Sequence, residues 1–247
     1  MRAARIVALV LAPLLVLAGP TRAGGVNFAW DACWSEGGAL DKSFLCNTNQ
    51  GAETAVGSFA PARDHADFLG TDITVDLYSR GTFPLPDWWE FINSGTCRRT
   101  ALQASFDFAE APQTACLDPW SRLALWQFSP YLIYNLPPSP PHGDAFLARI
   151  HLSAALQNGV PLAAGVEYDG FQLVISNTKT VGSDACEGCC GPLFLVFAQV
   201  RVFDQSGDAE YLSAALANQV ISWQGGYGNC ATPARNRTWG AIKSLYR

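Results

Sequence analysis

The stretch Asp72-Ile-Thr-Val-Asp-Leu-Tyr78 decides the predicted fold. Its apolar residues alternate with polar ones, which is the period-2 pattern of a strand that buries one face. Residues 102–108 alternate in the same way. Other strand-like segments are residues 26–30, 55–59, 88–92, 123–128, 131–135, 146–153, 171–176, 193–203 and 219–223. About eleven strands with turn residues between them predict an all-β protein, an antiparallel β-sandwich of the jelly-roll-like kind.

Helical periodicity is scarce. Residues 208–217 fit about two helical turns, and residues 238–246 fit a short C-terminal helix. With 49% hydrophobic and only 15% charged residues, the chain is not of the disordered class.

The N-terminus has the pattern of a secretory signal peptide. Arg2 and Arg5 precede the apolar run 6–18, and Thr21-Arg-Ala23 is a small-x-small cleavage site. We therefore expect residues 1–23 to be removed and residues 24–247 to form one secreted domain with no membrane span. The whole chain has a net charge of −5, and losing the basic leader makes it more acidic, which argues against nucleic acid as a partner.

The cysteines all follow the predicted cleavage site. They are Cys33, Cys46, Cys97, Cys116, Cys186, Cys189, Cys190 and Cys230. An even number in an exported chain predicts disulfides rather than a zinc or redox site. Short sequence separations favour the pairs 33–46 and 97–116. For the other four, the alternatives are 186–189 with 190–230, or 186–190 with 189–230.

Aromatic and acidic residues meet in Asp87-Trp-Trp-Glu90, inside the predicted strand 88–92. Adjacent residues of a strand point to opposite faces, so we expect one of Trp88 and Trp89 to be buried and the other to be available as a stacking platform. Asp87, Trp88, Trp89 and Glu90 are the candidate ligand-binding residues. The alternative is a secreted glycan-active hydrolase that uses an acidic pair here, with Asp118 as a further candidate.

Calcium is the one cofactor that the sequence suggests, because Asp204, Asp208 and Glu210 place oxygens at alternating positions of a polar turn. Asp64, His65 and Asp67 are a second possible metal-binding cluster. His65 otherwise reads as a surface histidine in a loop. No Gly-x-Ser-x-Gly nucleophile motif occurs, so no catalytic residue is assigned.

Several longer stretches carry a family resemblance. They are Val26-Asn-Phe-Ala-Trp-Asp-Ala-Cys33, residues 97–108, residues 179–189, Ile221-Ser-Trp-Gln-Gly-Gly226 and residues 231–247. Together they resemble a family of uncharacterised, cysteine-containing secreted proteins from environmental bacteria. The resemblance implies an exported, disulfide-bonded, β-rich protein and supplies no catalytic residues. At the level of strand pattern alone, the chain is also similar to cohesin-like jelly-roll modules.

These observations predict a secreted, non-catalytic binding or structural module. Extracellular polysaccharide or a cell-envelope component is the expected partner. The basic segment with Arg235, Arg237, Lys243 and Arg247 contains no acidic residue, and it suggests an additional docking contact.

Overall fold

The computed structural model describes residues 23–79, 85–91, 95–128, 132–133 and 145–226. Almost all of the predicted signal peptide lies outside these residues, as do Cys230, the basic C-terminal segment and the helix predicted over 238–246. None of the described helices is long and apolar enough to cross a membrane.

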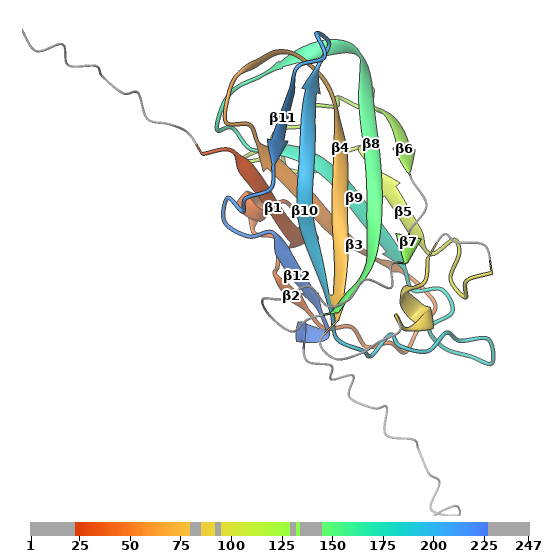
Figure 1. Ribbon diagram of the computed structural model, residues 1–247. Helices are drawn as coiled ribbons and strands as arrows, with labels where there is room; N and C mark the ends of the chain where they lie inside the picture. Colours follow the sequence, from red (N-terminus) through yellow and green to blue (C-terminus); the bar gives the residue numbers. More distant parts are fainter. Residues whose placement is uncertain (1–22, 80–84, 92–94, 129–131, 134–144, 227–247) are drawn as a thin grey trace, which may run out of the picture.

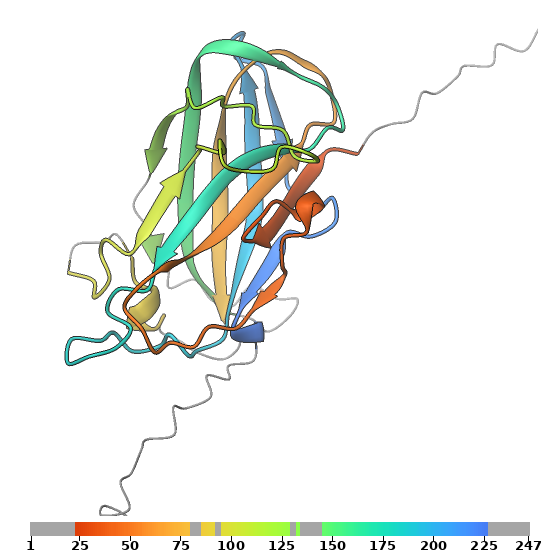
Figure 2. The same ribbon diagram turned by 180° about the vertical axis from the view of Figure 1, so that it is seen from behind.

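Two β-sheets form the molecule, one behind the other in Figure 1. The smaller sheet has the order β1-β3-β9-β5 and is antiparallel throughout. Its strands are β1 (Gly25–Trp30), β3 (Ala52–Ala60), β9 (Tyr168–Ser176) and β5 (Leu102–Ser105). It faces the viewer in Figure 2.

The larger sheet has the order β2-β12-β10-β4-β8-β6, with β11 beside β10 and β7 beside β8. Its strands are β2 (Asp41–Lys42), β12 (Val220–Trp223), β10 (Leu193–Asp204), β4 (His65–Ser79), β8 (Ala145–Leu162), β6 (Leu125–Phe128), β11 (Ala209–Leu212) and β7 (Leu132–Ile133). All neighbours are antiparallel except β2 and β12, which run parallel.

The core lies between the sheets, as the alternating pattern predicts. Val75 of β4 is paired with Phe197 on one side and Ile150 on the other, and all three are buried. Across the sandwich, the ring of Phe197 lies edge-on to Phe171 of the smaller sheet at 5.0 Å between centroids, and 6.0 Å from Phe28. The all-β sandwich is therefore confirmed.

Two predicted elements are wrong. Residues 88–92 are not a strand, because Asp87–Trp89 form a short 3-10 helix, η2, after Pro86. Residues 208–217 are not a helix: a turn through Gly207, whose φ is 90°, folds β11 back onto β10. Pairing with β10 provides cross-strand hydrogen bonds and packing that outweigh a weak local preference for helix.

One end of the sandwich is closed by aromatic rings. The ring of Trp88 lies 5.0 Å from Trp89 and 4.8 Å from Trp223, and all three are buried. The guanidinium of Arg98 covers the Trp88 ring at 3.5 Å and donates to the backbone carbonyls of Trp88 and Thr178. The prediction of one exposed tryptophan is wrong, since a 3-10 turn does not place neighbours on opposite faces as a strand does.

The disulfide pairs differ from those predicted by locality. Cys33 is bonded to Cys116, Cys46 to Cys189 and Cys97 to Cys186, with sequence separations of 83, 143 and 89. Cys190 is also disulfide-bonded, while Cys230 lies outside the described residues. Each local pair was predicted from sequence distance, but loops that meet at one end of a sandwich come from distant parts of the chain. The entropy of closing a loop grows only slowly with its length, so such pairs are not disfavoured.

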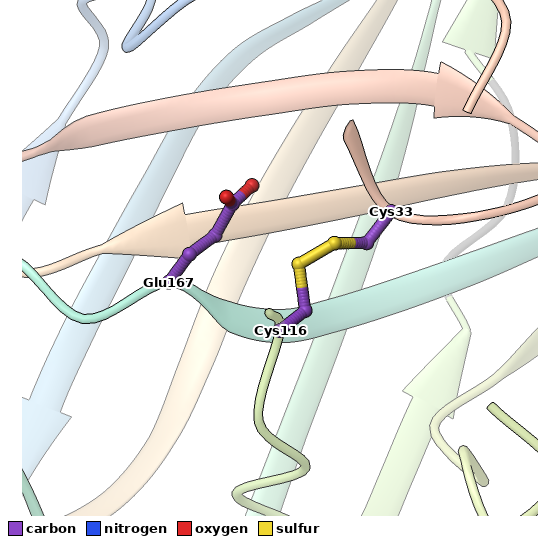
Figure 3. A group of neighbouring side chains, drawn as sticks. All are labelled: Cys33, Cys116 and Glu167. Atoms are coloured by element: carbon purple, nitrogen blue, oxygen red, sulfur yellow. A yellow bond between two sulfur atoms is a disulfide. The ribbon is translucent and has the colours of Figure 1, made fainter. Parts of the chain in front are cut away.

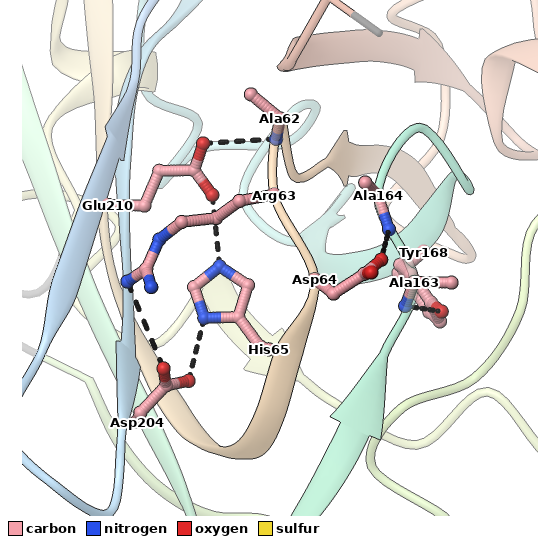
Figure 4. Close-up of polar contacts among 9 residues, drawn as sticks. All are labelled: Ala62, Arg63, Asp64, His65, Ala163, Ala164, Tyr168, Asp204 and Glu210. Carbon is pink, nitrogen blue, oxygen red and sulfur yellow. Dashed lines mark hydrogen bonds and ion pairs between the residues drawn. The ribbon is translucent and has the colours of Figure 1, made fainter. Parts of the chain in front are cut away.

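His65 is buried at the start of β4 rather than exposed in a loop. Its Nδ1 lies 2.6 Å from Asp204 Oδ1, and its Nε2 lies 2.9 Å from Glu210 Oε2 (Figure 4). Glu210 also accepts a hydrogen bond from the amide of Ala62 at 3.0 Å. The ring therefore ties the β10–β11 hairpin to the turn that precedes β4.

Candidate functional site: an acidic pocket over the smaller sheet

A pocket of about 700 Å³ lies on the outer face of the smaller sheet. Its floor contains Val56 of β3, Gln172 of β9 and Ser105 of β5, which face one another directly across three strands. Their neighbours Ala55, Leu173 and Ala104 point inward and are buried. The same alternation that builds the core therefore places the polar side chains of Gln172 and Ser105, together with Val56, on the floor of the pocket.

Two chain segments form the walls of the pocket. One follows β1 and contributes residues 31–33 and Glu36, and the other follows β5 and contributes Asp107 through Pro112. The Cys33–Cys116 disulfide joins the first segment to the chain just after the second one (Figure 3). The walls are thus covalently held over the sheet.

Glu36 provides a second link between the walls. Its Oε1 accepts hydrogen bonds from the amides of Thr114 at 2.8 Å and Ala115 at 3.1 Å. Burial opposes ionisation, but the backbone donors of Ala115, Thr114 and Cys116 outweigh it and lower the pKa of Glu36 below its ordinary value. The carboxylate is therefore charged at neutral pH and acts as an acceptor for a turn of backbone N–H groups.

The Glu167 carboxylate lies next to the Cys33–Cys116 disulfide (Figure 3). It accepts from Asn27 Nδ2 at 2.7 Å, and from the hydroxyls of Ser58 and Ser35. Among the described residues, Glu167 and the two cysteines are the one set of potential metal ligands close enough to share an ion (Figure 3). The sulfurs are joined in a disulfide, so they are not available as thiolate ligands.

Asp169, near the start of β9, is the buried acid of the pocket lining, with 1% of its surface exposed. Burial raises its pKa to about 7, and the nearby charges of Glu36, Asp118 and Glu167 act in the same direction. Gln113 Nε2 donates to Asp169 Oδ2 at 3.0 Å and partly offsets these effects. A carboxyl that changes its charge near neutral pH in the wall of a pocket is typical of functional sites.

The rim of the pocket carries more negative than positive groups. Asp31, Asp107 and Glu110 are exposed carboxylates, and Arg122 is the one cation among the lining residues that the structure describes. Arg122 lies 3.7 Å from Asp107 and 4.0 Å from Glu110, so it is shared loosely between them. Together with Glu36 and Asp169, the lining has five acidic residues and one basic residue.

The sequence-predicted binding residues lie elsewhere. Trp88 and Trp89 are buried, and neither they nor Asp87 and Glu90 line this pocket. Burial, and then the charge of Asp87, raise the pKa of Glu90. The two acids are thus close enough to interact, but the glycan hydrolase hypothesis based on them stays a prediction.

The residues predicted to bind calcium have other roles. Asp204 and Glu210 hold His65, and Asp208 contributes its backbone carbonyl, which accepts from the amide of Asp204 at 2.9 Å. Asp64 accepts from the amide of Ala164 at 2.7 Å. Calcium binding at this turn stays a prediction.

The pocket was not identified from the sequence. Its residues come from five separate segments, and no motif links Glu36 with Asp169. The sequence contains one relevant signal: two acidic residues, Asp107 and Glu110, lie at and just after the end of the alternating segment 102–108. Comparison with protein-family models gives no match, and comparison with curated proteins gives none either.

Proposed function

We propose that this protein is a secreted, non-catalytic binding module that takes part of a polysaccharide or another cell-envelope component into the pocket over β3, β9 and β5. The single observation that carries the proposal is the pocket itself: about 700 Å³, a floor with several polar side chains, and walls joined by a disulfide. Sites for small ligands usually have volumes of several hundred cubic ångströms and a few well-placed polar groups.

The rigidity of the walls supports binding. A wall held by Cys33–Cys116 and by Glu36 loses little conformational freedom when a ligand enters, which favours affinity. Disulfides are typical of oxidising compartments, and together with the signal-like N-terminus they support an extracellular role.

The lining residues do not support hydrolysis by a serine or cysteine nucleophile. They include no histidine, and their cysteine is in a disulfide, so a serine–histidine or cysteine–histidine pair is not among them.

A glycan array and pull-down on insoluble cell-envelope polysaccharide test the proposal with the oxidised full chain. Ser105→Trp places a large ring on the floor of the pocket, and Gln103→Trp is the matched control on the same strand, two residues earlier and outside the pocket. We expect wild type and Gln103→Trp to bind alike, and Ser105→Trp to bind at least tenfold more weakly. Absence of binding by wild type, or equal binding by all three proteins, would contradict the proposal.

A further inference from the structure

The pocket lining has more acidic than basic groups, and this imbalance favours ligands that carry a positive charge. Five carboxyl groups line it against one guanidinium. Lys42 adds a second cation next to it, but that amine is shared between Asp31 at 2.5 Å and Glu53 at 2.9 Å. With these neighbours included, the balance is still six acidic groups to two basic ones. Five of the six are charged at pH 6, because Asp169, with its pKa of about 7, is mostly protonated there.

The existing ion pairs leave most of this negative charge uncompensated. Arg122 is 61% exposed, and its contacts with Asp107 and Glu110 are at the long end of ion-pair distances. Exposed pairs of this kind contribute little, because water screens both partners. A cationic ligand therefore meets a favourable potential here, and an anionic one is repelled.

Asp169 of β9 provides a more specific contact. Asp169 is nine-tenths or more buried, and among the described residues only Gln113 donates to its carboxyl group, at Oδ2. Its other oxygen, Oδ1, accepts no hydrogen bond from the described residues. A buried carboxyl with an unused oxygen in the wall of a cavity is suited to accept a hydrogen bond from a ligand.

Neutral polar groups lie between the acids. Thr54, Ser105 and Gln172 add hydroxyl and amide groups to the floor, and each can both donate and accept. Such groups match the hydroxyls of a sugar ring, each of which can both donate and accept.

From this arrangement we infer that the pocket binds an amino sugar with a free, protonated amine, such as a unit of a de-N-acetylated amino-sugar polymer. The inference rests on the proposed function and names the ligand class of the same pocket. The ammonium group lies toward the carboxylates of the walls, and the hydroxyls lie toward the floor.

Isothermal titration of the oxidised full chain at pH 6, where the sugar amine is protonated, tests the inference. The probes are the β-1,4-linked tetramers of glucosamine and of N-acetylglucosamine, which differ in charge but not in backbone. We expect the free-amine tetramer to bind at least tenfold more tightly. The preference should fall several-fold in Asp107→Asn/Glu110→Gln and stay unchanged in Asp184→Asn, an exposed acid elsewhere.

The other outcomes separate this inference from the proposed function. Equal affinity for both tetramers, or tighter binding of the acetylated one, would overturn the amino-sugar assignment and leave the binding module in place. A tetralysine peptide that binds as tightly as the glucosamine tetramer would also overturn it, because charge alone would then explain recognition. If no sugar on the glycan array binds either, the proposed function fails together with the inference.

Discussion

The Glu36 carboxylate accepts a hydrogen bond from the backbone amide of Thr114 at 2.8 Å, across 78 residues of the chain. The Cys33–Cys116 disulfide joins the same two segments. One disulfide and a set of hydrogen bonds to the charged Glu36 therefore hold the pocket walls together, and these hydrogen bonds lower the pKa of Glu36.

Removing the charge of Glu36 should loosen the walls. We expect Glu36→Gln to lower the free energy of unfolding by about 1–2 kcal/mol, because hydrogen bonds to a charged acceptor are stronger than those to a neutral amide. Urea unfolding at pH 7 measures the change, and hydrogen exchange at Thr114 and Ala115 should accelerate. Glu110→Gln, a fully exposed acid of the same pocket, is the control and should change stability by less than about 0.5 kcal/mol.

Asp169 should make stability depend on pH. Its pKa is about 7 in the folded protein against an ordinary 3.8, so between these values the folded state holds a proton that the unfolded chain has lost. The contribution of Asp169 to stability is therefore highest below about pH 4 and falls as the pH rises to about 7, by up to roughly 4 kcal/mol.

Asp169→Asn removes this titration. We expect the variant to match wild type at about pH 4 and to exceed it in stability at pH 8, with unfolding in urea followed across the range. Asp184→Asn, an exposed acid, should keep the wild-type profile. An Asp169→Asn profile parallel to wild type would show that Asp169 ionises normally.

The disulfide between the walls should matter more for ligand binding than the others. Mass spectrometry of the oxidised protein should find the linked peptides 33–116, 46–189 and 97–186. Cys33→Ser/Cys116→Ser should lose about 4 kcal/mol of stability and at least tenfold in ligand affinity. Cys46→Ser/Cys189→Ser should lose comparable stability but retain the affinity, since this bond lies away from the pocket. Equal effects on affinity would contradict the assigned site.

His65 should be a structural cross-link rather than a surface residue. We expect His65→Gln to cost roughly 3 kcal/mol, because the buried carboxylate of Asp204 and the partly buried carboxylate of Glu210 lose a shared partner. His151→Gln, on the outer face of β8, is the control and should be nearly neutral. Thermal unfolding of both variants checks this, and similar melting temperatures would exclude the cross-link.

Alternation in the sequence was sufficient to predict the sandwich. The pattern around Ile73, Val75 and Leu77 assigns one face of a strand to the core, and the same rule located most of the other strands. Local preference failed where packing opposed it, as in the 3-10 turn at Trp88 and in the β11 strand.

The candidate site depended on tertiary structure. Glu36 follows β1 and Asp169 lies in β9, and the two line one pocket because the smaller sheet has the order β1-β3-β9-β5. The cysteine pairs likewise depend on which loops the fold brings together. Side-chain alternation is a property of neighbouring residues, so it can be read along the chain. Pairing between strands and loops far apart depends on which faces pack together, and that is settled only when the whole chain has folded.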